Sequence, residues 1–157
     1  MSNGHRRYLR RALELAVQAR EHGNQPFGAV LVDADGKVVL EAENSVLTDR
    51  DVTAHAETNL IRAASERFGP DFLERCTLYT STEPCVMCAG AIALGNVRHV
   101  VFGLSSEQFD ALFPHDPPRT QQLLTSREVF ARDDHQVEVS GPHLPKESLA
   151  VHDGFWE

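Results

Sequence analysis

The spacing of apolar and polar residues predicts a regular succession of helices and strands along most of the chain. Apolar residues recur at helical spacing from Leu9 to Val17, which predicts a first helix that ends at Gly23. The segments 26–33 and 37–44 are typical of strands, and the Asp-Gly turn between them favours a hairpin.

Two helix–strand pairs follow this hairpin. Apolar positions at helical spacing predict a helix over residues 55–67, and a short strand is expected over 76–81. Pro84 suits the start of the next helix and Gly95 its end, with another strand expected over 98–104. Because strands joined through helices favour a sheet covered on both faces, the pattern predicts an α/β fold.

The last third of the chain has a weaker pattern. We expect a loop over residues 113–120, a helix over 120–131 and an irregular tail over 141–157 that ends in an aromatic pair. No linker divides the chain, so a single domain is expected over residues 1–157.

The composition suits an ordinary globular protein, with 157 residues, 41% apolar and 24% charged. No apolar run approaches the roughly 20 residues that cross a bilayer. Three cysteines without a secretory signal favour the reducing cytoplasm over a disulfide framework. The formal net charge of −8 argues against a surface that holds a phosphate backbone, although arginines of the first helix can still form a local basic patch.

Candidate metal chemistry begins with Cys85 and Cys88, three residues apart at the start of an expected helix. Both sulfurs can point to one side of the first turn, where unpaired backbone N–H groups stabilise the metal-binding thiolate form. Alone, the two cysteines also suit a redox pair or two small buried side chains. His55 changes this interpretation, because zinc prefers imidazole and thiolate donors and three protein ligands leave a fourth position open. Cys76 lies in a strand pattern and is interpreted as a core residue.

His55 and Glu57 stand two positions apart at the start of an expected helix. On a regular helix their side chains would point about 200° apart, so they share only a site beyond the helix end. We therefore expect two helix starts to meet over one zinc ion, with Glu57 beside the open position. Zinc lowers the pKa of bound water, and Glu57 can move the released proton to a ring nitrogen and then to a departing amine. This chemistry is the hydrolytic release of ammonia from an amidine-like carbon.

The motifs "HAE" at residues 55–57 and "PCVMC" at 84–88 resemble the signature of the zinc-dependent cytidine deaminase superfamily. The similarity extends from "PFGAVLV" to "VVFG", and "LYTSTEPCVMCAGAI" is similar to guanine deaminases and tRNA adenosine deaminases. The resemblance implies an α/β fold of three α/β/α layers around a mixed sheet of about five strands. It also implies zinc ligands and a proton shuttle: His55, Cys85 and Cys88 on the metal, and Glu57 for the proton.

The same resemblance implies three contacts with the substrate. Asn44 occupies the position of an asparagine that hydrogen-bonds the base, although asparagine is also common in turns at strand ends. The backbone amide of Ala56 would face a carbonyl or ring atom. Phe27 would stack on the base, or would instead be the first core residue of its strand.

Two features favour a free base over transfer RNA as the substrate. The chain is acidic, and its ending "HDGFWE" resembles guanine deaminases, in which an aromatic C-terminal segment closes over the pocket. Trp156 and Phe155 would form such a lid, or would simply clasp the C-terminus. Guanine recognition requires an acid, for which Asp110 is the first candidate, with Glu107 and Asp116 behind it.

We therefore predict a guanine deaminase that produces xanthine and ammonia. The alternatives are a tRNA adenosine deaminase, a deaminase of cytosine or of an amino-triazine such as ammeline, and a catalytically silent zinc module used for binding. The intact Glu57 argues against the silent module. The resemblance also implies a homodimer, in which the C-terminal segment can be exchanged between subunits.

Overall fold

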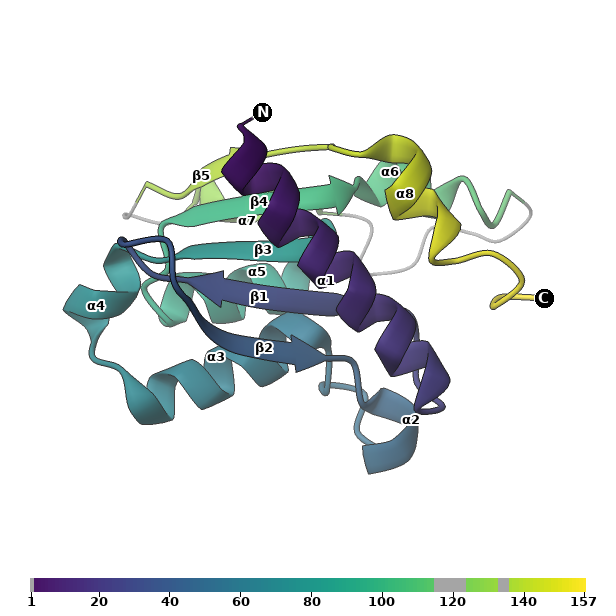
Figure 1. The fold of residues 1–157 in the computed structure, drawn as a ribbon, viewed down its shortest axis with the longest axis horizontal. Coiled ribbons are helices and arrows are strands. Elements are labelled where there is room, and N and C mark those ends of the chain that lie inside the picture. The colour runs from purple at the N-terminus through teal and green to yellow at the C-terminus, as the bar shows by residue number, and fades with distance from the viewer. Residues whose placement is uncertain (1, 115–123, 133–135) are drawn as a thin grey trace.

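The computed structural model describes residues 2–114, 124–132 and 136–157. Five strands form one sheet within these residues: β1 (Gly28–Val32), β2 (Val38–Glu43), β3 (Thr77–Thr82), β4 (His99–Leu104) and β5 (Glu138–Ser140). Their spatial order is β2-β1-β3-β4-β5, as Figure 1 shows. β1 runs antiparallel to both neighbours, whereas β3, β4 and β5 are parallel, so the sheet is mixed.

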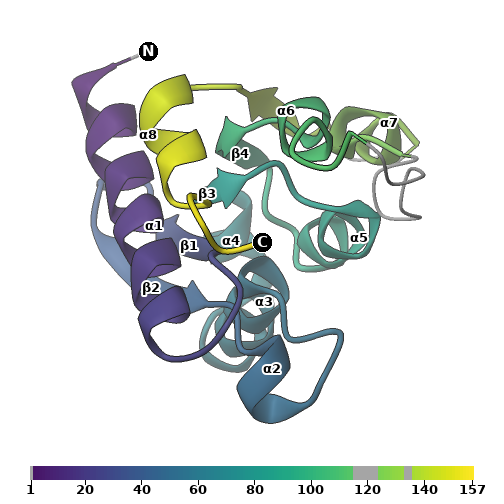
Figure 2. The same ribbon diagram turned by 90° about the vertical axis from the view of Figure 1, so that its right-hand side faces the viewer.

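Helices cover both faces of this sheet. The helices are α1 (Asn3–Glu21), α2 (Val46–Asp49), α3 (Ala56–Arg67), α4 (Pro70–Glu74), α5 (Val86–Leu94), α6 (Ser106–Asp110), α7 (Ser126–Phe130) and α8 (Pro145–Ala150). α1 and α8 lie on one face, and α3 and α5 lie on the other (Figure 2). The expected three-layer α/β/α fold with a mixed five-stranded sheet is therefore confirmed.

The core lies in two layers on opposite faces of the sheet. Successive side chains of a strand point to opposite faces, so neighbours in β1 serve different layers. Leu31 packs in the layer under α3 and α5 with Leu60, whereas Val30 packs in the layer under α1 with Leu9. All four side chains are fully buried, which explains why the β1 sequence is continuously apolar.

Two glycines allow helices to approach the sheet closely. A Cβ atom at Gly28 in β1 would overlap the backbone of Ala12 in α1. A Cβ atom at Gly103 in β4 would overlap the Ser148 side chain in α8. These contacts fix α1 and α8 against the sheet, and α8 leads directly to the C-terminal segment.

The predicted elements before residue 105 are confirmed close to their predicted bounds. The helix predicted over 120–131 is shorter in its described part, because Thr125 caps a helix that begins at Ser126. The tail predicted to be irregular contains α8, and β5 was not predicted because its pattern is exposed–intermediate–exposed. Most of the loop predicted over 113–120 lies outside the described residues. Within the part of the chain that is described, no helix is long and apolar enough to span a membrane.

The segments that carry the predicted zinc ligands and substrate contacts meet at one edge of the sheet, formed by the ends of its strands and not by an outer strand. β3 and β4 end at this edge, and the antiparallel β1 begins there. Ligand sites of open α/β sheets form at the carboxyl ends of parallel strands. The C-terminal segment that follows α8 runs across this edge, where the turned view places the C-terminus (Figure 2).

Candidate active site

His55 and Cys85 occupy equivalent positions in two neighbouring helices. Each is the extended residue just before the first turn, His55 before α3 and Cys85 before α5. A side chain at this position commonly accepts a hydrogen bond from the free N–H groups of its helix, but neither residue does so here. Since α3 packs against α5, both side chains are free to face a shared site.

The three predicted zinc ligands lie together. The Sγ atoms of Cys85 and Cys88 are each 3.5 Å from Nδ1 of His55. All three donor atoms lie within 4.8 Å of one another. Tetrahedral ligands at ~2.3 Å for sulfur and ~2.1 Å for nitrogen lie ~3.6 Å apart, so this donor set fits one zinc ion.

The two thiols differ in acidity because they are adjacent. The Cys88 thiol hydrogen-bonds to Cys85 and, with His55, lowers the pKa of Cys85 to about 4. The pKa of Cys88 is raised, because its thiol is the donor to Cys85 and is itself buried. One thiolate therefore forms readily, and a bound cation favours loss of the second proton. Cys76 lies in the core as predicted, where burial raises the pKa of its thiol to about 11.

Glu57 is a buried carboxylate beside this donor group. It lies in the first turn of α3, and its Oε1 accepts a hydrogen bond from the hydroxyl of Thr80 in β3. Burial raises the pKa of Glu57, and the Thr80 hydrogen bond and the neighbouring His55 offset part of that rise. A raised pKa makes the carboxylate a better proton acceptor near neutral pH, as a proton shuttle requires.

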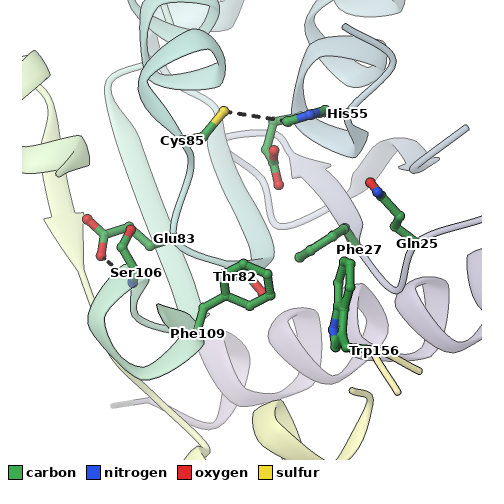
Figure 3. Close-up of a pocket in the computed structure, with 10 residues that line it drawn as sticks. Gln25, Phe27, His55, Thr82, Glu83, Cys85, Ser106, Phe109 and Trp156 are labelled. Carbon is green, nitrogen blue, oxygen red and sulfur yellow. Dashed lines mark hydrogen bonds between the residues drawn. The ribbon is translucent and has the colours of Figure 1, made fainter. Parts of the chain in front are cut away.

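A pocket opens next to His55, Glu57 and Cys85 and is walled by aromatic rings (Figure 3). The ring centroids of Phe27 and Phe109 are 5.8 Å apart in an edge-to-face arrangement. The remaining lining residues are Gln25, Thr82, Glu83, Ser106 and Trp156. Phe27 and Trp156, which were predicted to contact the substrate, both line this pocket.

Asn44 and Ala56 do not line this pocket, and Asn44 acts first as a turn residue. Its Oδ1 accepts the backbone N–H of Val46 at 3.0 Å. Its Nδ2 donates to Oε1 of Gln25 at 3.3 Å, and Gln25 does line the pocket. Ala56 is fully buried in the first turn of α3. The structure therefore places Asn44 behind Gln25.

Of the predicted aromatic and acidic contacts in the last third of the chain, some line the pocket and others do not. The indole N–H of Trp156 donates to Nδ1 of His152 at 3.1 Å, which holds the ring at the pocket. Phe155 contacts Trp156 edge-to-face with centroids 4.7 Å apart, but it does not line the pocket. Asp110 and Glu107 are not among the lining residues either, and Asp116 lies outside the described residues.

The sequence analysis missed several residues of the site or its support, among them Gln25, Glu83, Phe109 and His152. Gln25 and Glu83 adjoin recognised motifs, in "QPF" and "TEPC", and that adjacency was an available signal. Phe109 lies in a part of the chain with no clear periodicity. His152 opens the recognised ending "HDGFWE", but nothing in that segment indicates that it holds Trp156.

The three-layer fold and the His-Cys-Cys donor set together define a zinc-binding deaminase domain. Residues 2–104 match the family model of the cytidine and deoxycytidylate deaminase zinc-binding region. The chain belongs to this family, and zinc is the cofactor for which its donor group is suited.

Three similar proteins are named as deaminases, and their names give different substrates. A probable cytosine deaminase of Schizosaccharomyces pombe is 41% identical over 150 residues, which cover 96% of this chain and 91% of that protein. The guanine deaminase of Bacillus subtilis is 44% identical over 108 residues, 68% of this chain and 67% of that protein. A solved structure from studies of A-to-I editing by tRNA deaminases at the wobble position has a TM-score of 0.75 at 31% identity, and covers 92% and 98% of the two chains.

Proposed function

We propose that this protein is a zinc-dependent hydrolytic deaminase of a free amino-heterocycle, with guanine as the first candidate substrate. One observation carries the proposal: Phe27, Phe109 and Trp156 line the same pocket as Glu57. Aromatic walls suit a flat heterocycle, because they stack on its faces and exclude water around it. This pocket therefore offers a planar base a place beside the candidate proton shuttle.

His55, Cys85 and Cys88 would hold the zinc ion, which when bound supplies a Lewis acid that activates water. Glu57 would take a proton from the attacking water and pass it to the adjacent ring nitrogen, and the second proton of that water would pass to the departing amine. The carbon–oxygen bond forms, the carbon–nitrogen bond breaks, and ammonia leaves. With guanine, the other product is xanthine.

Several contacts support a free base rather than RNA. Trp156 lines the pocket and donates to His152, so the C-terminal segment contributes one wall of the pocket. None of the described residues that line the pocket is Lys or Arg. An RNA stem is held mainly through phosphate contacts from such residues, and the chain carries a formal net charge of −8.

Gln25 offers a group that can read the edge of a base. Its Oε1 accepts from Asn44, which leaves the amide N–H₂ as a donor at the pocket. In this proposal Asn44 acts through Gln25, and the backbone amide of Ala56 remains a candidate contact at the start of α3. Asp110 is not among the lining residues, and its role in recognising guanine stays a prediction.

Cytosine is the second candidate. The similarity to the probable cytosine deaminase extends over 96% of this chain, which takes in most of the C-terminal third. Cytosine presents the same amidine-like carbon and amino group, so the roles of Glu57 and the zinc ligands would not change.

The test is ammonia release by the zinc-loaded protein from guanine, cytosine, adenine, an amino-triazine and an anticodon stem-loop RNA. Release from guanine, with xanthine as the second product, would support the first candidate, and release from cytosine alone would select the second. Release from the RNA with none from any free base would contradict the proposal.

A further inference from the structure

Glu83 is a buried acid whose hydrogen bonds join three segments that are distant in sequence. It follows β3 and stands two residues before Cys85. Its Oε1 accepts the backbone N–H of Ser106 at 3.0 Å. Its Oε2 accepts the backbone N–H of Ser126 at 3.0 Å and the Ser126 hydroxyl at 2.7 Å. The carboxylate thus ties the metal-binding loop to the first residues of both α6 and α7.

These bonds are not needed to start either helix. Ser105 already caps α6, and a reciprocal bond from the Gln108 side chain completes the capping box. Thr125 and Glu128 form the same arrangement at α7. The N–H groups at the first helical position still lack an intrahelical partner, and Glu83 accepts from both. Its distinctive contribution is therefore the connection between the helices and the loop.

The connection matters for the pocket because α6 carries Phe109. Figure 3 shows Glu83 bonded to Ser106 and, from the same helix, the Phe109 ring facing into the pocket. The Phe109 centroid lies 5.8 Å from that of Phe27 and 5.7 Å from that of Trp156. A shift of α6 relative to the loop would move this ring between the other two walls.

We infer that Glu83 is a positioning residue that sets the distance between the Phe109 wall and the metal-binding loop, and with it the shape of base that the pocket accepts. The substrate in this inference, a free heterocycle, rests on the proposed function. The geometry does not, because it follows from the hydrogen bonds of Glu83. Residues of the metal-binding loop would thus have two different roles: the cysteines hold the metal, and Glu83 beside them fixes the position of the pocket wall.

The first experiment compares Glu83→Gln with the wild-type protein, using whichever base the wild type deaminates. Glutamine keeps the length of the side chain but replaces one acceptor oxygen with an NH₂ donor. That donor would face the N–H donors that the carboxylate accepts from. We expect KM to rise roughly tenfold with kcat within about threefold of wild type, since ground-state and transition-state binding are lost together. Zinc content should stay unchanged. Glu66→Gln, at an exposed acid of α3, is the matched control and should leave both constants unchanged.

A second readout does not depend on any substrate. Trp156 is the only tryptophan of the chain, and its ring contacts Phe109. Its fluorescence therefore reports on the packing of the pocket walls. We expect acrylamide to quench Trp156 more strongly in Glu83→Gln than in the wild type or in Glu66→Gln.

Ser126→Ala provides a milder variant that removes only the hydroxyl donor to Glu83. Ser126→Ala should shift KM and quenching in the same direction as Glu83→Gln, by a smaller amount. It serves as the test variant if Glu83→Gln does not fold. Wild-type KM and quenching in a folded Glu83→Gln protein would overturn the inference. If Glu83→Gln does not fold, wild-type KM and quenching in Ser126→Ala would overturn it. If the wild type deaminates no free base, the proposed function fails, while the quenching comparison still tests the role of Glu83.

Discussion

At the scale of single residues, Glu57 combines burial, a hydrogen bond from Thr80 and a raised pKa beside the zinc donors. We expect Glu57→Gln to retain stoichiometric zinc and to lose activity by a factor of about 10² to 10⁴, because an amide cannot carry the proton. Zinc content by mass spectrometry and the rate of ammonia release check both parts. Wild-type turnover in a zinc-loaded Glu57→Gln protein would remove the assignment of Glu57 as the proton shuttle.

His152 makes a separate, residue-level prediction about stability. Burial lowers the pKa of His152 to about 4, with Arg20 contributing repulsion. Between the ordinary pKa of about 6.5 and this value, the unfolded chain binds a proton that the folded chain does not. The free energy of unfolding should therefore fall by roughly 3 kcal/mol as the pH drops from about 6.5 to about 4.

The variant His152→Asn tests this contribution, because its Oδ1 can still accept from the indole of Trp156 while the side chain no longer titrates. Denaturant unfolding across this pH range should show a shallower loss of stability in the variant. Identical slopes for the two proteins would contradict the assignment, and all other acid-sensitive groups are common to both.

At the scale of elements, the zinc donors join the starts of α3 and α5, since His55 and Cys85 directly precede these helices. Chelation of the metal should therefore lower the melting temperature and speed amide hydrogen exchange at both helix starts. The middle of α1, which packs on the other face of the sheet, is the internal control. Uniform exchange changes across α1, α3 and α5 would indicate a global effect instead of a local one.

The elements also differ in how far the sequence predicts them. α1, α3 and β1 were predicted because their apolar residues repeat with the period of a helix or form a buried run. β5 and α8 were missed because three exposed or half-exposed residues and one short helix carry too little periodicity. β5 exists through its parallel pairing with β4, and α8 through its close contact with Gly103. Those are tertiary causes that a local pattern does not contain.

At the scale of the whole molecule, the formal net charge of −8 makes a prediction about nucleic acid. An anticodon stem-loop should bind weakly near 0.15 M salt, because few phosphate contacts are available to release counterions. Fluorescence anisotropy across a salt series measures this. Tight binding with a steep salt dependence would favour the tRNA alternative and would direct attention to the arginines of α1.

The oligomeric state is a second whole-molecule prediction. We expect a homodimer, as the family resemblance implies. Light scattering should give about twice the chain mass of 17.4 kDa. Exchange of the C-terminal segment is not required to place Trp156, which reaches the pocket of its own chain. A monomeric mass would contradict the dimer without affecting the site assignments.

The sequence by itself determined the donors and most of the helices and strands, because both depend on short spacings: the His-x-Glu and Cys-x-x-Cys motifs and the periods of helix and strand. The family resemblance also anticipated Phe27 and Trp156 at the substrate, but only the tertiary structure showed that they join Phe109 as walls of one pocket and what supports those walls. Phe27, Phe109 and Trp156 come from three distant segments, and Glu83 gains its role from partners beyond residue 105. Such contacts depend on how the chain returns to one edge of the sheet, which no local spacing encodes.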